Sequence, residues 1–153
     1  MDNQTPQDEM SGDQISDYEL LRLIGEGGFG RVWLAKNRTT GHLRAVKLVP
    51  LRRSGNADPA GREIMSLTRL EANLRRRHTN HVTIHHVGKT EKHLYYVMDL
   101  ADDVSGEPAG ASADYQPASL ERLLQDGPLT PQQCSRFARE LLAGLSSIHE
   151  AGM

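Results

Sequence analysis

The chain has 153 residues, a length that suits one domain, and its 18 Lys and Arg against 20 Asp and Glu give a formal net charge of −2. This balance excludes a broad basic field of the kind that binds nucleic acid. No apolar run approaches the ~20 residues that cross a bilayer, so we expect no membrane-spanning segment. Cys134 is the only cysteine, which excludes an internal disulfide, and the first residues lack a signal-peptide pattern; both observations favour a cytoplasmic location.

Residues 1–16 are polar, rich in Asp, Gln and Ser, and almost free of large apolar side chains. Such a composition buries too little apolar surface to fold, so we expect a disordered tail. Beyond the tail, Leu21 and Leu23 alternate with polar residues, as in a strand. Glycine takes positive φ and lets the backbone approach a ligand, so that its N–H groups can point at phosphate oxygens. The strand leads into such a run, Gly25-Glu26-Gly27-Gly28-Phe29-Gly30.

Two common phosphate-binding motifs share these glycine spacings, and the neighbouring residues argue against both. In a dinucleotide-binding fold the glycines open a helix, whereas residues 31–35 alternate polar and apolar and include Val32 and Trp33, as in a strand. In a Walker A loop the next two residues are Lys and then Ser or Thr, and here they are Arg31 and Val32. The glycines are therefore expected at the tip of a two-stranded hairpin.

A third strand, residues 42–49, follows a polar turn at 37–41 and carries Lys47. A glycine-rich hairpin followed by a lysine on the next strand resembles the start of a protein kinase domain of the serine/threonine type, and the likeness extends over residues 18–153. It implies an α+β fold, in which a sheet of about five antiparallel strands and one helix form a nucleotide-binding N-lobe. The first helices of an incomplete helical C-lobe would follow, with residues 17–101 forming the N-lobe and hinge.

The resemblance also implies roles for single residues. Lys47 would contact the α- and β-phosphates of ATP and pair with a glutamate on the helix that follows. Asp58 and Pro59 supply the N-cap and first-turn proline of that helix. Glu63 is the preferred partner and Glu71 the alternative, so Lys47 and Glu63 are the catalytic assignments. The positions that would surround the nucleotide are Ile24, Gly25, Glu26, Gly27, Gly28, Phe29, Gly30, Val32 and Ala45.

Two further strands are expected at residues 82–87 and 94–99, joined by a turn at 88–92. The second resembles the fifth strand of the family and the hinge that follows it. That likeness implies Met98 as the gatekeeper beside adenine, an Asp99 carbonyl that accepts from the adenine amino group, and an Ala101 N–H that donates to a ring nitrogen. Asp103 is the nearest candidate for the acid that binds the ribose hydroxyls.

The connection after the hinge, residues 102–118, contains Gly, Ala, Ser, Pro and acidic residues and is expected to be a flexible insertion like those of bacterial kinases. The C-lobe part, residues 119–153, begins with a short helix over 120–126. A long helix opens at Thr130. Its apolar face requires a covering surface and is formed by Phe137, Ala138, Leu141, Leu142, Leu145 and Ile148.

The sequence contains no His-Arg-Asp, Asp-Phe-Gly or Ala-Pro-Glu motif, so the catalytic aspartate and the magnesium ligands of the family are not in it. The resemblance therefore implies the ATP-binding part of a kinase that transfers the γ-phosphoryl group, with Mg²⁺, to hydroxyl groups of a protein substrate. We expect no measurable activity from this chain alone and assign none of its residues as a metal ligand. The alternative is a non-catalytic nucleotide-binding or partner-docking regulatory module, with the last helix as a candidate surface for self-association.

Four histidines, His78, His81, His85 and His86, invite interpretation as a zinc site. Residues i and i+4 of a strand lie about 13 Å apart, however, which is too far to share one metal. His78 instead resembles the histidine of the His-x-Asn turn that precedes the fourth strand of the family. The three arginines at 75–77 are typical of a solvated helix end, with a docking patch as the alternative.

Overall fold

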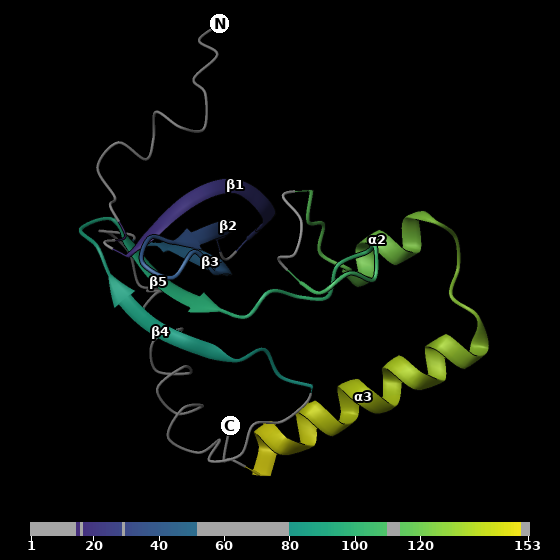
Figure 1. Cartoon of the computed structure of the whole chain (residues 1–153). Helices are drawn as coiled ribbons and strands as arrows, with labels where there is room; N and C mark the ends of the chain where they lie inside the picture. Colours follow the sequence, from purple (N-terminus) through teal and green to yellow (C-terminus); the bar gives the residue numbers. More distant parts are fainter. Residues whose placement is uncertain (1–14, 16, 29, 52–79, 110–113, 151–153) are drawn as a thin grey trace, which may run out of the picture. The chain divides into compact units, whose positions relative to one another are not determined.

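The computed structural model describes residues 15, 17–28, 30–51, 80–109 and 114–150. Two compact units make up the chain: Met1–Ala60 with Ile84–Met98, and Gly61–Thr83 with Asp99–Met153 (Figure 1). Several predictions concern residues outside the described part, namely Phe29, the helix that starts near Asp58, the two candidate glutamates Glu63 and Glu71, the arginines at 75–77, and His78.

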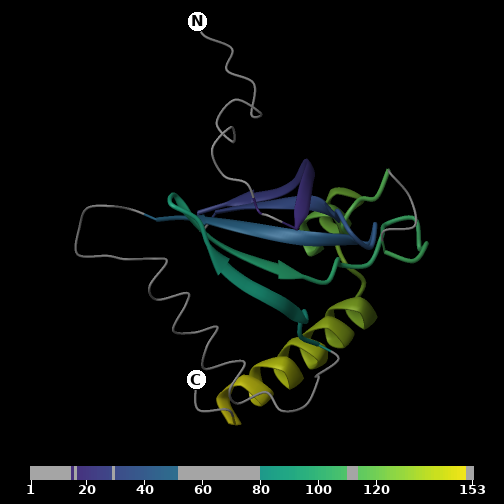
Figure 2. The same ribbon diagram turned by 60° about the vertical axis from the view of Figure 1, so that its left-hand side comes forward.

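The first unit is built on one antiparallel sheet. Its strands in chain order are β1 (Tyr18–Gly27), β2 (Gly30–Asn37), β3 (Leu43–Pro50), β4 (Ile84–Lys89) and β5 (His93–Met98). They lie in the order β1-β2-β3-β5-β4, and every neighbouring pair is antiparallel. The turned view shows them as a single twisted layer (Figure 2). The predicted antiparallel sheet is thereby confirmed.

Side chains alternate between the two faces of this sheet because successive residues of a strand point to opposite sides. One face carries the main hydrophobic cluster, in which Trp33, Val46 and Val97 form a row across β2, β3 and β5. Burial of each such side chain contributes about 1.5–3 kcal/mol, so this cluster strongly favours one register of the strands. The opposite face carries the other buried residues of the central strands: Leu34, Ala45, Val49, Leu94 and Tyr96.

Packing of the first unit begins before the first strand. Ile15 belongs to the hydrophobic cluster and is only 4% exposed, although it falls in the segment 1–16 that was expected to be a disordered tail. Its carbonyl oxygen accepts a hydrogen bond from the Tyr18 N–H at 3.1 Å. This one apolar residue therefore anchors the chain to the sheet just ahead of β1.

Strands β1 and β2 form the hairpin that was predicted around the glycines. Gly27 pairs with Gly30 at its tip, and Gly25 pairs with Val32. Gly30 has a φ of +127°, and a Cβ at this position would clash with the carbonyl oxygen of Leu48 on β3. The chain continues from the glycines as a strand and not as a helix, which confirms the hairpin over the dinucleotide-binding interpretation.

The second unit contains two helices, α2 (Leu120–Gln125) and α3 (Pro131–Glu150), at the predicted positions. Ser119 caps α2, because its Oγ accepts a hydrogen bond from the Arg122 N–H at 3.2 Å. At the start of α3, Thr130 and Gln133 form a reciprocal capping box. Thr130 Oγ accepts from the Gln133 N–H at 3.2 Å, and the Thr130 N–H donates to Gln133 Oε1 at 2.8 Å.

Two side chains attach α3 to the segment before β4. Asn80 Nδ2 donates to the Glu140 carbonyl at 2.6 Å, and His81 Nε2 lies 2.9 Å from the Gly144 carbonyl oxygen. Gly144 is buried, and a Cβ there would lie 3.4 Å from His81 Nε2, which is close to ordinary van der Waals contact. His81 therefore contacts the backbone of a helix.

Part of the apolar face of α3 is exposed, with Leu141 at 63% and Leu142 at 62% of full exposure. Self-association through this helix stays a prediction. Within the described ranges, no helix has the length and apolar character required to cross a membrane.

We expect Gly30→Ala to lower the free energy of unfolding by at least about 2 kcal/mol, because the new methyl group meets the Leu48 carbonyl at a φ that other residues rarely adopt. Gly27→Ala is the matched control, since nothing lies within 4 Å of a Cβ at that position. Thermal unfolding followed by circular dichroism measures both. Equal melting temperatures for the two variants would contradict the close approach of Gly30 to β3.

Candidate functional site

The first unit brings four of the predicted site residues onto one face of the sheet. Val32 on β2 pairs with Lys47 on β3, and two residues further along β3, Ala45 pairs with Met98 on β5. Residues paired across antiparallel strands share a face, as do residues two apart along a strand. Val32, Lys47, Ala45 and Met98 therefore form a compact group on the face opposite the hydrophobic cluster.

The glycine hairpin lies next to Lys47 through the same pairing. Val32 pairs with Gly25 on one side and with Lys47 on the other, so Gly25 and Lys47 are separated by one strand. Neighbouring strands are about 4.8 Å apart, which puts the two backbones roughly 10 Å from each other. The hairpin and Lys47 thus lie in one row of paired residues.

The tip of the hairpin has open space above its backbone. Nothing lies within 4 Å of a Cβ built on Gly27 or Gly28, and both residues are exposed. Glu26 and Arg31 flank the tip with an ion pair, Oε1 to Nε 3.0 Å, between side chains that are about half exposed. Such a pair is worth little in stability. The tip therefore leaves room for a ligand beside its backbone.

Ile24 occupies an irregular position in β1. The pairing passes from Leu23 opposite Trp33 directly to Gly25 opposite Val32, so Ile24 is the extra residue of a β-bulge. A bulge re-aims the side chains around it and increases the local twist. The sequence pattern predicted a regular strand here and gave no sign of the bulge.

Lys47 lies beside an aromatic ring that the sequence reasoning missed. Its Nζ is above the ring of Tyr96, 5.4 Å from the ring centroid, and Tyr96 is its direct partner across β3 and β5. Tyr96 is 8% exposed. An ammonium group within about 6 Å of an aromatic face is attracted by the ring electrons, so the ring favours one position of the amine. The signal was available, because Tyr96 precedes Met98 by two residues and shares its face.

The second unit contains the predicted hinge residues Asp99 and Ala101. The Asp99 N–H donates to the Thr83 carbonyl at 3.0 Å, and the Ala101 carbonyl accepts from the Tyr115 hydroxyl at 3.2 Å. These two hydrogen bonds anchor the short hinge backbone at both ends. The sequence gave no signal for Tyr115, which follows Ala101 by 14 residues.

Asp103, the predicted ribose ligand, is already engaged by its own loop. It is 7% exposed, and its Oδ1 accepts hydrogen bonds from the N–H and the Oγ of Ser105, each at 3.0 Å. This arrangement is an Asx turn, in which the carboxylate replaces a backbone acceptor. The burial and these bonds count against Asp103 as a ligand of ribose hydroxyls.

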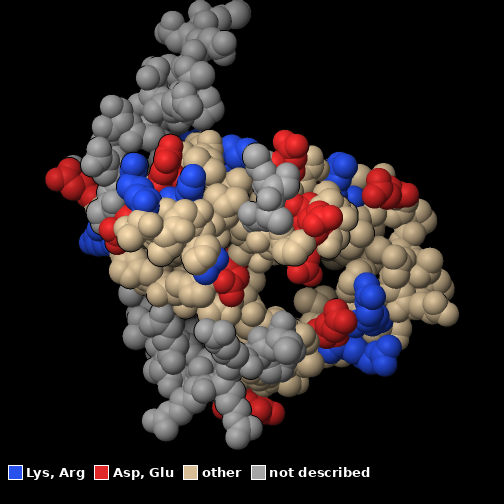
Figure 3. All heavy atoms as spheres, in the orientation of Figure 1, with Lys and Arg blue, Asp and Glu red and all other residues tan. Residues whose placement is uncertain are grey.

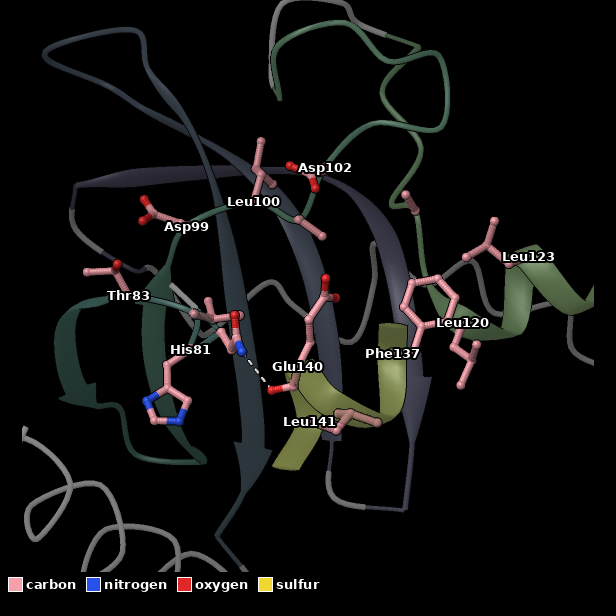
Figure 4. A pocket seen from close by; sticks show the side chains of 14 residues that line it. His81, Thr83, Asp99, Leu100, Asp102, Leu120, Leu123, Phe137, Glu140 and Leu141 are labelled. Carbon is pink, nitrogen blue, oxygen red and sulfur yellow. Dashed lines mark hydrogen bonds between the residues drawn. The ribbon is translucent and has the colours of Figure 1, made fainter. Parts of the chain in front are cut away.

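A cavity of about 700 Å³ borders the hinge within the second unit. Asp99, Leu100 and Asp102 lie along one side of it, and Phe137 and Glu140 project from α3 on the other side (Figure 4). The remaining wall is made of residues 80–83, most of which are polar, and of the apolar side chains of Ala101, Ala118, Leu120, Leu123 and Leu141. The hinge is therefore reachable by a ligand in this unit.

Charge is spread evenly over the face of the molecule that Figure 3 shows. Lys and Arg are interspersed there with Asp and Glu, and neither sign forms a broad patch (Figure 3). On α3, for example, Arg136 Nε and Glu140 Oε1 are 4.0 Å apart. This pattern matches the balanced composition of the chain.

The sequence matches the model of the protein kinase domain family over residues 18–153. CBL-interacting serine/threonine-protein kinase 1 of Arabidopsis thaliana is 29% identical over 145 residues, which are 93% of this chain and 28% of that protein. Calcium/calmodulin-dependent protein kinase type 1B of Rattus norvegicus is 28% identical over 142 residues, which are 92% of this chain and 36% of that protein. The chain thus spans about a third of the length of these relatives.

These relatives come from a plant and a rodent. The segment after the hinge had suggested a likeness to bacterial kinases in particular. The plant and rodent relatives show that the likeness is not specific to bacterial kinases. The match covers nearly all of the chain, and the observed sheet, glycine hairpin and helices agree with it. The chain belongs to the protein kinase family, and its relatives are serine/threonine kinases.

Proposed function

We propose that this chain is the ATP-binding part of a serine/threonine protein kinase, an enzyme that transfers the γ-phosphoryl group of ATP to hydroxyl groups of a protein substrate. The observation that carries the proposal is the row of paired residues Gly25, Val32 and Lys47. It places a cation two strands away from a glycine hairpin whose tip, at Gly27 and Gly28, has open surroundings.

The phosphate end of ATP suits the hairpin and Lys47. Phosphate oxygens are strong acceptors, and they bind both exposed backbone N–H groups and ammonium groups. Gly27 and Gly28 have no side chain that would keep phosphates away, and their surroundings are open. Lys47 would supply the positive charge that neutralises the α- and β-phosphates. Its glutamate partner, Glu63 or Glu71, lies outside the described residues, so that choice stays open.

The adenine end suits the apolar residues on the same face of the sheet. Ala45 is 3% exposed and pairs with Met98, so a small side chain faces the proposed base site. The Asp99 carbonyl and the Ala101 N–H would form the two polar contacts to the edge of adenine. A flat apolar site with a few placed polar groups is typical of small-molecule recognition.

Magnesium and the chemical step need residues that this chain does not provide. Among the described residues, no three His, Cys, Asp or Glu side chains are grouped so that they could bind a metal ion. The sequence also lacks the His-Arg-Asp and Asp-Phe-Gly motifs. We therefore propose that the chain binds ATP without measurable phosphoryl transfer, and that Mg²⁺ would be held by groups other than these.

The decisive test compares Lys47→Ala with Lys36→Ala, which removes an exposed lysine from β2. Isothermal titration calorimetry should show ATP binding to the unmodified chain and a loss of about ten- to a hundred-fold in affinity for Lys47→Ala, the usual range for a charged hydrogen bond. Lys36→Ala should leave the affinity unchanged. Adenosine, which has no phosphates, should bind Lys47→Ala and the unmodified chain equally. Absence of ATP binding, or an equal loss for adenosine, would contradict the proposal.

The ring of Tyr96 should hold the Lys47 amine in place. In nuclear magnetic resonance spectra, ring currents should shift the ε-methylene protons of Lys47 upfield in the unmodified chain and in Tyr96→Phe, but not in Tyr96→Leu. ATP affinity should fall about two- to five-fold in the leucine variant alone, in line with the strength of a partly exposed cation–π contact. Unshifted ε-methylene resonances of Lys47 in the unmodified chain would rule out the contact. Equal losses of ATP affinity in the phenylalanine and leucine variants would show that the aromatic ring is not what supports ATP binding.

A further inference from the structure

The segment that follows the hinge is built on paired backbone. The Ala118 N–H donates to the Asp102 carbonyl at 2.8 Å, and the Val104 N–H donates to the Gln116 carbonyl at 3.0 Å. Asp103 and Pro117 form an antiparallel bridge between these two bonds. Composition alone indicated a flexible insertion over 102–118. The two hydrogen bonds and the bridge bring residue 115 back beside the hinge.

Tyr115 is the buried centre of this segment. Its relative exposure is 0%, and it is among the largest fully buried side chains of the chain. Its hydroxyl donates to the Ala101 carbonyl at 3.2 Å. A tyrosine hydroxyl is costly to bury without a partner, so this hydrogen bond and the burial of the ring support each other.

The hydrogen bond fixes the part of the hinge that the proposed function uses. Ala101 itself is exposed, and its N–H donates to no other described residue. Anchoring its carbonyl to Tyr115 restricts rotation about its backbone, and the bond from the Asp99 N–H to the Thr83 carbonyl restricts the preceding residues. A donor that is already oriented loses less entropy when a ligand binds.

We propose that Tyr115 is a positioning residue for nucleotide binding: through the Ala101 carbonyl it orients the Ala101 N–H toward the ring nitrogen beside the adenine amino group. The proposal rests on the proposed function, because it assumes that adenine binds at this hinge. It assigns the segment after the hinge a role as a clamp on the hinge backbone. The ligand class is a purine nucleotide with an acceptor nitrogen at that ring position.

The test uses Tyr115→Phe, which keeps the buried ring and removes only the hydroxyl. Binding of two ligands is measured by calorimetry: ATP, and the ATP analogue in which a carbon replaces the ring nitrogen beside the amino group. We expect Tyr115→Phe to weaken ATP binding about three- to ten-fold, the range for one hydrogen bond, and to leave binding of the analogue unchanged. A purely structural role for Tyr115 would weaken both ligands equally, and that result, or no change for ATP, would overturn the proposal.

Tyr95→Phe is the matched control, because it removes the same group from β5 in the first unit. It should leave both affinities unchanged. The carbonyl-carbon resonance of Ala101 gives a readout that needs no ligand: it should shift in Tyr115→Phe and stay in place in Tyr95→Phe. If the unmodified chain binds no ATP, the proposed function fails and the positioning role fails with it, whereas a shifted resonance would still establish the clamp contact. ATP binding with an unshifted resonance would overturn the clamp and leave the proposed function standing.

Discussion

The antiparallel register of β1, β2, β3 and β5 is the constraint on which the candidate site depends. It places Gly25, Val32, Lys47 and Tyr96 in one row. A slip of one residue would exchange the two faces of a strand, so that Val46 would take the place of Lys47. The cluster on the other face opposes such a slip, because Trp33, Val46 and Val97 lose their burial if β3 moves. Hydrophobic packing on one side of the sheet therefore fixes the position of a charged group on the other.

The second unit positions its hinge by a different means. The hinge residues belong to no strand or helix. Individual hydrogen bonds from a side chain and from loop backbone hold them, in place of the regular hydrogen bonds between paired strands. Thr83 accepts from one end of the hinge and Tyr115 donates to the other, while residues 102–104 and 116–118 pair with each other. The sheet positions its residues through burial shared among many side chains, whereas the hinge relies on a few directional bonds. Loss of a single hydroxyl group matters more in the second arrangement.

Much of the sheet and both helices could be predicted from local patterns. Alternation of apolar residues marked the strands, and Thr130 and Gln133 marked the start of α3 through capping chemistry that acts within four residues. Lys47 was found because its spacing from the glycines reflects strand pairing. The bulge at Ile24, the hydrogen bond from Asn80 to α3 and the hydrogen bond from Tyr115 to the hinge were missed, since each depends on a partner chosen by tertiary packing. The ribose role of Asp103 stays a prediction, and the sequence gave no sign that the carboxylate of this residue closes a local turn.

The occupied carbonyl of Ala101 has a consequence for synthetic inhibitors. A compound that donates a hydrogen bond to this oxygen would share it with the phenol of Tyr115 and would be limited to the second lone pair. Compounds that only accept a hydrogen bond from the Ala101 N–H would not encounter the Tyr115 hydroxyl in this way. The side chain of one tyrosine in a connecting segment could thus separate two chemical series that a kinase with an unoccupied carbonyl at that place would bind alike.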